Sequence, residues 1–234
     1  MRKTQLSSSG DKQTGKYYHI YNRGVEKRDI FMDEKDFIRF LISMKEFNQV
    51  EQVGSLLELQ QRRKKDIRCP NKLFGHRMSL VKILCYSLNL NHYHILVEQL
   101  VDKGIQKFMQ KLGMGYAKYF NKKYNRSGAL FQGRYKATLI KTTGQLQKVS
   151  CYINGNPEIH KIIDQAEKWQ YSSYQNYLGL RNGTLCDKDV ILKDFQSMKE
   201  YKKLVDVIIK ESIEKKLALK LDLWDEEKKY LLEL

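Results

Sequence analysis

Residues 81–97 of this 234-residue chain read VKILCYSLNLNHYHILV, and this stretch decides the fold. It contains two runs rich in branched and aromatic side chains, 81–89 and 92–97, separated only by Leu90 and Asn91. Such runs favour β-strands, and a two-residue connection between them favours a tight hairpin. The stretch therefore predicts two neighbouring antiparallel strands.

Further elements are predicted on both sides of the hairpin. A strand over 16–22 precedes Asp33, which we expect to cap a helix whose apolar residues recur at helical spacing. After the hairpin we expect a basic helix over 102–124 that begins at Asp102, a strand over 134–140 and a helix from about 145 to 154. The first six elements follow the order β-α-β-β-α-β, which predicts an α+β, ferredoxin-like antiparallel sheet with helices on one face.

The charge of the chain is strongly uneven. The net charge at pH 7 is +16, but residues 185–234 carry −1, so the excess lies in residues 1–184. Residues 103–157 contain 11 Lys and Arg but no Asp or Glu. Because like charges on one helix face repel, a merely solvated face usually mixes both signs. The acid-free stretch therefore favours a phosphate-binding surface, and its interleaved aromatic rings suit either base stacking or the core.

Composition narrows the class of protein. Hydrophobic residues make up 41% of the chain and only 2 residues are Pro, which indicates a folded domain rather than a basic tail. No long apolar run is present, so we expect no membrane association and a cytoplasmic protein. The four cysteines form no CxxC pair, which indicates reduced thiols.

Two histidines stand in the second strand of the hairpin. His92 and His94 are two residues apart, so on a strand they project from the same face while Tyr93 projects from the other. Both imidazoles can then bind one metal ion. On this spacing alone, two unrelated histidines at a half-exposed edge remain the alternative. One turn apart on the helix near 150, Tyr152 and Asn156 share a face.

With these motifs the chain resembles the single-tyrosine transposases of the HUH endonuclease superfamily, and most closely their REP-associated (RAYT) subgroup. The resemblance runs from about Tyr17 to Leu180. It is carried in order by the motifs YHIYNRG at 18–24, NHYHILV at 91–97, SGALFQGRYKA at 127–137 and YINGNP at 152–157, and WQYSSY at 169–174 continues it.

The resemblance implies a metal-dependent endonuclease and strand transferase that opens single-stranded, hairpin-containing DNA through a 5′-phosphotyrosine, in transposition or in the processing of repeat elements. Tyr152 would be the nucleophile. His92, His94 and Asn156 would hold Mg²⁺ or Mn²⁺, with Asn156 as a helix-end cap the alternative. The basic residues expected to contact DNA are Arg23, Lys118, Lys122, Lys123, Arg126, Arg134 and Lys136. The resemblance also implies a monomer or a homodimer, and a cytoplasmic protein of the prokaryotic type that is associated with the nucleoid.

Two features depart from the family pattern. Leu90 stands where relatives usually have Pro, and the segment 51–79 is longer than the usual connection. We therefore expect residues 1–184 to form the nuclease domain with 51–79 as an insertion. The added tyrosine-bearing helix belongs to this domain, and residues 185–234 form a helical C-terminal extension.

Two other functions compete with a transposase. One is a non-catalytic, ferredoxin-like nucleic-acid-binding module, domesticated from a transposase. An RRM-type binder would need a basic-Gly-aromatic pattern in its central strands, which 81–89 and 92–97 lack. The other is a zinc hydrolase, which would need a further His, Cys or carboxylate at ligand spacing.

Overall fold

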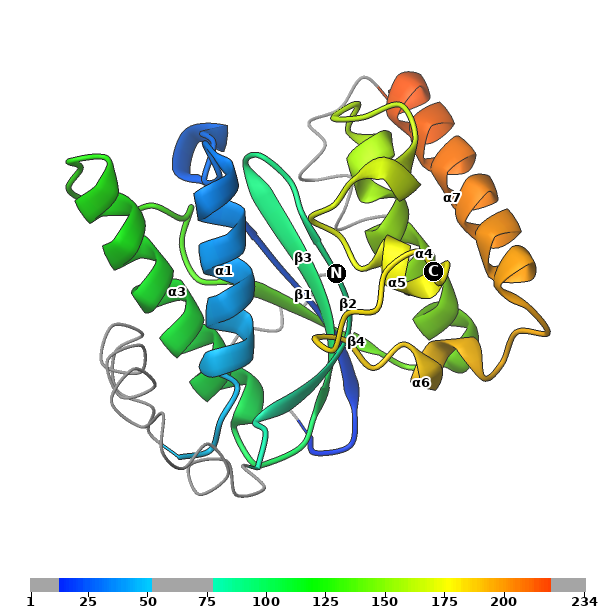
Figure 1. Ribbon diagram of the computed structural model, residues 1–234, viewed down its shortest axis with the longest axis horizontal. Coiled ribbons are helices and arrows are strands. Elements are labelled where there is room, and N and C mark those ends of the chain that lie inside the picture. The colour runs from blue at the N-terminus through cyan, green and yellow to red at the C-terminus, as the bar shows by residue number, and fades with distance from the viewer. Residues whose placement is uncertain (1–12, 52–77, 220–234) are drawn as a thin grey trace, which may run out of the picture.

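The computed structural model describes residues 13–51 and 78–219 (Figure 1). In chain order the elements are β1 (Tyr17–Arg23), the 3-10 turn η1 (Val25–Lys27), α1 (Glu34–Glu46), β2 (Val81–Leu88), β3 (His92–Gln99), α3 (Gly104–Lys123), β4 (Lys136–Ile140), α4 (Thr143–Ile159), the 3-10 turn η2 (Ala166–Lys168), α5 (Tyr174–Tyr177), α6 (Asp189–Leu192) and α7 (Met198–Leu219).

The strands form one four-stranded sheet in the order β2-β3-β1-β4. Every neighbouring pair is antiparallel. This is the ferredoxin-like α+β arrangement that the sequence predicts, and the hairpin of β2 and β3 is confirmed. The segment before α1 stabilises the hairpin turn, because the carbonyl oxygen of Leu90 accepts hydrogen bonds from the backbone N–H groups of Ile30 (2.8 Å) and Phe31 (3.0 Å).

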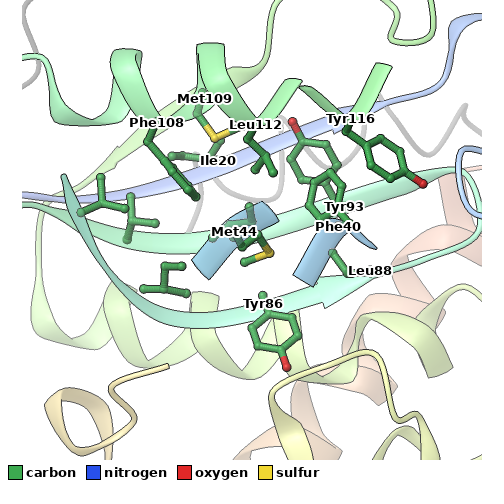
Figure 2. Close-up of a cluster of buried hydrophobic side chains, with 14 of the residues drawn as sticks. Ile20, Phe40, Met44, Tyr86, Leu88, Tyr93, Phe108, Met109, Leu112 and Tyr116 are labelled. Carbon is green, nitrogen blue, oxygen red and sulfur yellow. The ribbon is translucent and has the colours of Figure 1, made fainter. Parts of the chain in front are cut away.

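One face of the sheet is covered by α1 and α3 (Figure 1). Asp33 caps α1 as expected, because its side chain accepts the N–H of Asp36 at 3.1 Å. Figure 2 shows the core on this side, where sheet residues such as Tyr93 meet Phe40 of α1 and Tyr116 of α3. Tyr116 is fully buried, so its ring belongs to the core and is not available for base stacking.

The opposite face of the sheet is covered by α4, and α7 packs on the outer side of α4 (Figure 1). Gly155 permits this close contact, since a Cβ atom there would lie 2.5 Å from Cγ1 of Ile209. Asn154 connects α4 to two neighbouring segments. Its amide donates to the hydroxyl of Tyr201 on α7 (2.8 Å), and its side-chain carbonyl accepts from the hydroxyl of Ser173, which precedes α5 (2.7 Å). The helix that carries Tyr152 is therefore packed on both sides.

Several element boundaries differ from the sequence-based expectation. Helix α3 begins at Gly104, so Asp102 is not its first residue. Strand β4 begins at Lys136, because pairing with β1 starts where Lys136 faces Tyr21. Helix α4 does not end at residue 154 but continues through Pro157 to Ile159. A proline removes only one backbone donor, and the buried surroundings of α4 outweigh that loss.

The proposed domain boundary at residue 184 stays a prediction. The helices beyond it, α6 and α7, share one core with α4 and the sheet. Most of the expected insertion 51–79 and residues 220–234 lie outside the described residues. None of the helices described in the structure combines the length and apolarity that a membrane span requires.

Candidate active site

The two histidines of β3 lie side by side on the face of the sheet that α4 covers. Strand alternation places His92 and His94 on this face, and their ring centroids are 5.2 Å apart. Tyr93 points into the opposite core, where it is 1% exposed. The paired projection predicted from the spacing is thus observed, and both imidazoles are buried rather than at an exposed edge.

Helix α4 brings Tyr152 and Asn156 to the same place. Thr142 caps the helix by accepting the N–H of Gln145 at 3.1 Å, which fixes where its turns begin. The Tyr152 ring meets the His94 ring edge to face at 5.8 Å. One turn later, Oδ1 of Asn156 lies 3.1 Å from Nε2 of His92. The alternative role of Asn156 as a helix-end cap is wrong, because the helix continues beyond it.

Each histidine of the pair is held through its Nδ1 atom. Nδ1 of His92 lies 2.6 Å from Oδ1 of Asn91, and the Asn91 amide is itself oriented because its Nδ2 donates to the carbonyl of Lys27 at 3.1 Å. Nδ1 of His94 lies 2.9 Å from Nε2 of His19. Such contacts fix the tautomer and orientation of metal-binding histidines. They leave Nε2 as the nitrogen through which either ring would bind an ion.

These atoms fit a divalent ion. With Nδ1 of His92 donating to Asn91, Nε2 carries a lone pair, and the Oδ1 atom of Asn156 that faces it is also an acceptor. Two acceptors 3.1 Å apart require a donor or a cation between them. Adjacent ligands of an octahedral ion with bonds of about 2.1 Å lie about 3 Å apart. The amide oxygen favours Mn²⁺ or Mg²⁺, whereas imidazoles alone would also suit other transition metals.

A zinc hydrolase is not favoured by the surroundings of the pair. In residues 13–51 and 78–219, no three His, Cys, Asp or Glu side chains gather as a group able to hold a metal ion. The mixed set of two imidazoles and one amide also differs from that of a catalytic zinc site, in which His, Cys or carboxylate side chains supply all three protein ligands.

Three residues of the site were not identified from the sequence. Asn89, the residue directly after β2, places its Nδ2 2.8 Å from Nε2 of His92. The ring centroid of His160, the residue after α4, is 4.5 Å from that of His92. The Tyr21 ring lies 5.8 Å from the His94 ring. The sequence could have indicated His160, which follows Asn156 at helical spacing, and Tyr21, which shares a strand face with His19. In the sequence, Asn89 looks like an ordinary residue of the hairpin turn.

The basic residues predicted to bind DNA fall on both faces of the sheet. Arg23 and Lys136 belong to strand positions that face α4, since Arg23 pairs with His92 and Lys136 with Tyr21. The Lys136 ammonium lies 5.9 Å from the centre of the Tyr21 ring. Arg134 is exposed two residues before β4. Arg23 and Lys136 therefore lie on the same face of the sheet as the candidate site.

The remaining predicted DNA contacts lie on or just after α3, which covers the other face of the sheet. Lys118 and Lys122 are exposed there. Lys123 instead pairs with Asp33 (2.6 Å) and the buried Asp36 (2.7 Å). Arg126 stacks on the Phe120 ring at 5.8 Å. A DNA strand at Tyr152 would have to extend past an edge of the sheet to contact these side chains.

The fold and the site together define an α+β protein in which two histidines of β3 lie beside a tyrosine of α4, on one face of the sheet. Residues 75–156 match the family model described as "Transposase IS200 like". The matched segment includes His92, His94, Tyr152 and Asn156. This match confirms the resemblance to the single-tyrosine transposases, and it supports a DNA-processing enzyme of the transposase class.

Two solved structures are similar to the chain at low identity. One, described as the structure of the REP-associated tyrosine transposase bound to a REP hairpin, has 13% identity and a TM-score of 0.46, and the match covers 80% of this chain and 94% of that chain. The other is tRNA(His) guanylyltransferase from Saccharomyces cerevisiae, with 8% identity, a TM-score of 0.36 and coverage of 86% and 80%. No curated protein matches the chain. Scores this low carry no inference about function.

Proposed function

We propose that the protein is a metal-dependent endonuclease and strand transferase that acts on single-stranded, hairpin-containing DNA. The observation that carries this proposal is the convergence of His92, His94, Asn156 and Tyr152 from β3 and α4, within the family-matched segment. All four residues belong to one chain, so we propose that a monomer is sufficient for the first chemical step. The same reaction serves transposition or the processing of repeat elements, and the DNA substrate determines which.

In the proposed reaction the Tyr152 hydroxyl oxygen attacks the scissile phosphorus and loses its proton. A bond forms between this oxygen and phosphorus, and the bond from phosphorus to the 3′ oxygen breaks. The products are a 5′-phosphotyrosine and a 3′-hydroxyl that has gained a proton. The same steps in reverse rejoin strands, because the new ester conserves the phosphodiester bond.

The chain's own side chains position this chemistry. His92, His94 and Asn156 would hold Mg²⁺ or Mn²⁺, which when bound neutralises phosphate charge. Helix α4 holds Tyr152 beside His94 because α7 and the sheet pack against the helix from both sides. Tyr152 is only 3% exposed, so its side chain or the segment over it must move before DNA can reach the hydroxyl.

A tyrosine comparison tests the proposal. Tyr21 and Tyr152 both lie with ring centroids 5.8 Å from the His94 ring, and both are buried, so each serves as the control for the other. We expect wild type and Tyr21→Phe to form a covalent adduct with single-stranded hairpin oligonucleotides in Mn²⁺ or Mg²⁺. Tyr152→Phe should form none, and EDTA should abolish the adduct.

Mass spectrometry of the adduct identifies the modified tyrosine. An adduct on Tyr21, or an unchanged yield in Tyr152→Phe, would overturn the assignment of the nucleophile. Tight hairpin binding by wild type with no adduct across a broad panel of hairpins would favour the non-catalytic binding module instead.

A further inference from the structure

The amide group of Asn89 occupies the point where two proposed metal ligands converge. Its Nδ2 atom lies 2.8 Å from Nε2 of His92 and also donates to Oδ1 of Asn156. Asn89 is fully buried, and its own backbone N–H donates to the carbonyl of His92 at 2.8 Å. The side chain is thus held in the site by the hairpin itself.

The hydrogen bonds around His92 explain why the donor group of Asn89 lies between Nε2 of His92 and Oδ1 of Asn156. Because the Asn91 amide is fixed by its bond to Lys27, its Oδ1 faces Nδ1 of His92 and accepts that proton. Nε2 of His92 then needs a donor, and so does Oδ1 of Asn156. In the structure both needs are met by the NH₂ group of Asn89, which stands in for a cation.

The Asn89 amide can exchange the positions of its Oδ1 and Nδ2 atoms without losing its hydrogen bond to Ser87. Its Oδ1 lies 3.3 Å from the hydroxyl of Ser87, which donates to it. A hydroxyl can also accept a hydrogen bond. If the Asn89 amide turns by about 180°, a rotation that the broad terminal torsion of Asn permits, its NH₂ group donates to Ser87. Its Oδ1 then faces Nε2 of His92 and Oδ1 of Asn156.

We propose that Asn89 is a further metal-binding residue, which caps the two ligand atoms through Nδ2 without an ion and binds the ion through Oδ1 after the amide turns. The proposal rests on the proposed metal-dependent function and adds a ligand from β2 to those from β3 and α4. An additional oxygen ligand suits Mn²⁺ and Mg²⁺, which prefer several oxygen atoms.

Binding of Mn²⁺ alone, without DNA, tests this role. Electron paramagnetic resonance measures the unbound Mn²⁺ in titrations of wild type, Asn89→Ala, Asn89→Asp and His94→Ala. Loss of an oxygen ligand in Asn89→Ala should weaken binding by about 10-fold or more. Asn89→Asp should bind Mn²⁺ more tightly than wild type, because a carboxylate is a stronger ligand for a hard cation than an amide.

The variants separate this inference from the proposed function. Mn²⁺ binding that is lost in His94→Ala but unchanged or tightened in Asn89→Ala would overturn the role of Asn89 and leave the histidine site intact. Wild type that fails to bind Mn²⁺ would overturn both. If Asn89→Ala does not fold, Asn89→Asp decides alone, since affinity equal to or below that of wild type would contradict a ligand role. Far-ultraviolet circular dichroism establishes that each variant is folded.

Discussion

Nε2 of His19 lies 2.9 Å from Nδ1 of His94, so a histidine of β1 contacts a histidine of β3 on the side away from Nε2, the nitrogen that we propose binds the metal. The two rings are stacked with centroids 5.1 Å apart. This contact follows from the sheet register, in which β1 runs directly beside β3. The contact links the first motif of the chain to the two-histidine motif, and we expect His19 to position His94.

Replacement of His19 by leucine is expected to weaken Mn²⁺ binding by about 10–100-fold, the usual effect of losing the partner that orients a metal-binding histidine. His19→Gln keeps an acceptor oxygen for Nδ1 of His94 and should lose less affinity. Both effects can be read from Mn²⁺ titrations followed by paramagnetic resonance. Unaltered Mn²⁺ affinity in a folded His19→Leu protein would show that the contact does not serve the metal site.

Gly155 is expected to be essential for the packing of α7 on the tyrosine-bearing helix. A Cβ at this position would lie 2.5 Å from Cγ1 of Ile209, so Gly155→Ala should lower the free energy of unfolding by about 1–3 kcal/mol. Gly144, near the start of α4, provides the matched control, because a Cβ there would meet no atom within 4 Å. Urea unfolding curves measure both changes.

The compensating variant Ile209→Ala distinguishes a steric effect from a helix effect. It removes the atoms that a Cβ at residue 155 would meet, so Gly155→Ala should cost less in that background than in wild type. Equal costs in both backgrounds would contradict close packing of α7 against Gly155.

Lys123 is expected to act mainly in stability. Burial opposes its charge, but hydrogen bonds to Asp33 and Asp36 raise the pKa of Lys123 well above that of an ordinary lysine. Because the unfolded pKa is about 10.4, the stability that this raised pKa contributes is complete at pH 7 and is lost as the pH rises through the folded pKa. Lys123→Gln leaves the buried Asp36 without its cation and should destabilise by about 2 kcal/mol, less than a fully buried pair would.

Lys122 is exposed on the same turn and serves as the control for Lys123. Lys122→Gln should change the melting temperature little. If Lys123→Gln is as stable as Lys122→Gln but binds hairpin DNA more weakly, Lys123 is a DNA-binding residue and the ion pair is secondary.

The thiols of Cys85 and Cys151 are expected to resist alkylation. Burial raises the pKa of Cys85 well above its usual range and that of Cys151 to about 12. At pH 8 a thiol with the latter pKa is ionised in only about one molecule in ten thousand, and the thiolate is the reactive form. Iodoacetamide followed by mass spectrometry should label both residues only in denaturant. Rapid labelling of native protein would reveal opening of the core between α4 and the sheet.

The fold and the main site residues were accessible from sequence because they depend on local patterns. Alternation along 92–97 placed both histidines on one face, and helical spacing placed Asn156 one turn after Tyr152. Contacts between distant segments were not accessible. The pairing of Lys123 with Asp36 depends on how α3 packs against α1, so charge counting did not reveal it, and DNA binding by Lys123 stays a prediction. Similarly, the role proposed for Asn89 depends on its contact with Asn156, which lies 67 residues later in the sequence.

Lys136 and Lys118 are expected to contact different parts of a bound DNA, because they lie on opposite sides of the sheet. Lys136 is on the face that holds Tyr21 and His94, whereas Lys118 is exposed on α3. Each lost phosphate contact lowers the magnitude of the slope of log affinity against log salt by about 0.7 for single-stranded DNA.

We expect Lys136→Gln to show this change with a short single strand that spans only the cleavage site. Lys118→Gln should match wild type on that strand and differ only on a longer hairpin substrate that can extend past the sheet edge. Fluorescence anisotropy at several salt concentrations gives both slopes, and an effect of Lys118→Gln on the short strand equal to that of Lys136→Gln would contradict the separation of the two surfaces.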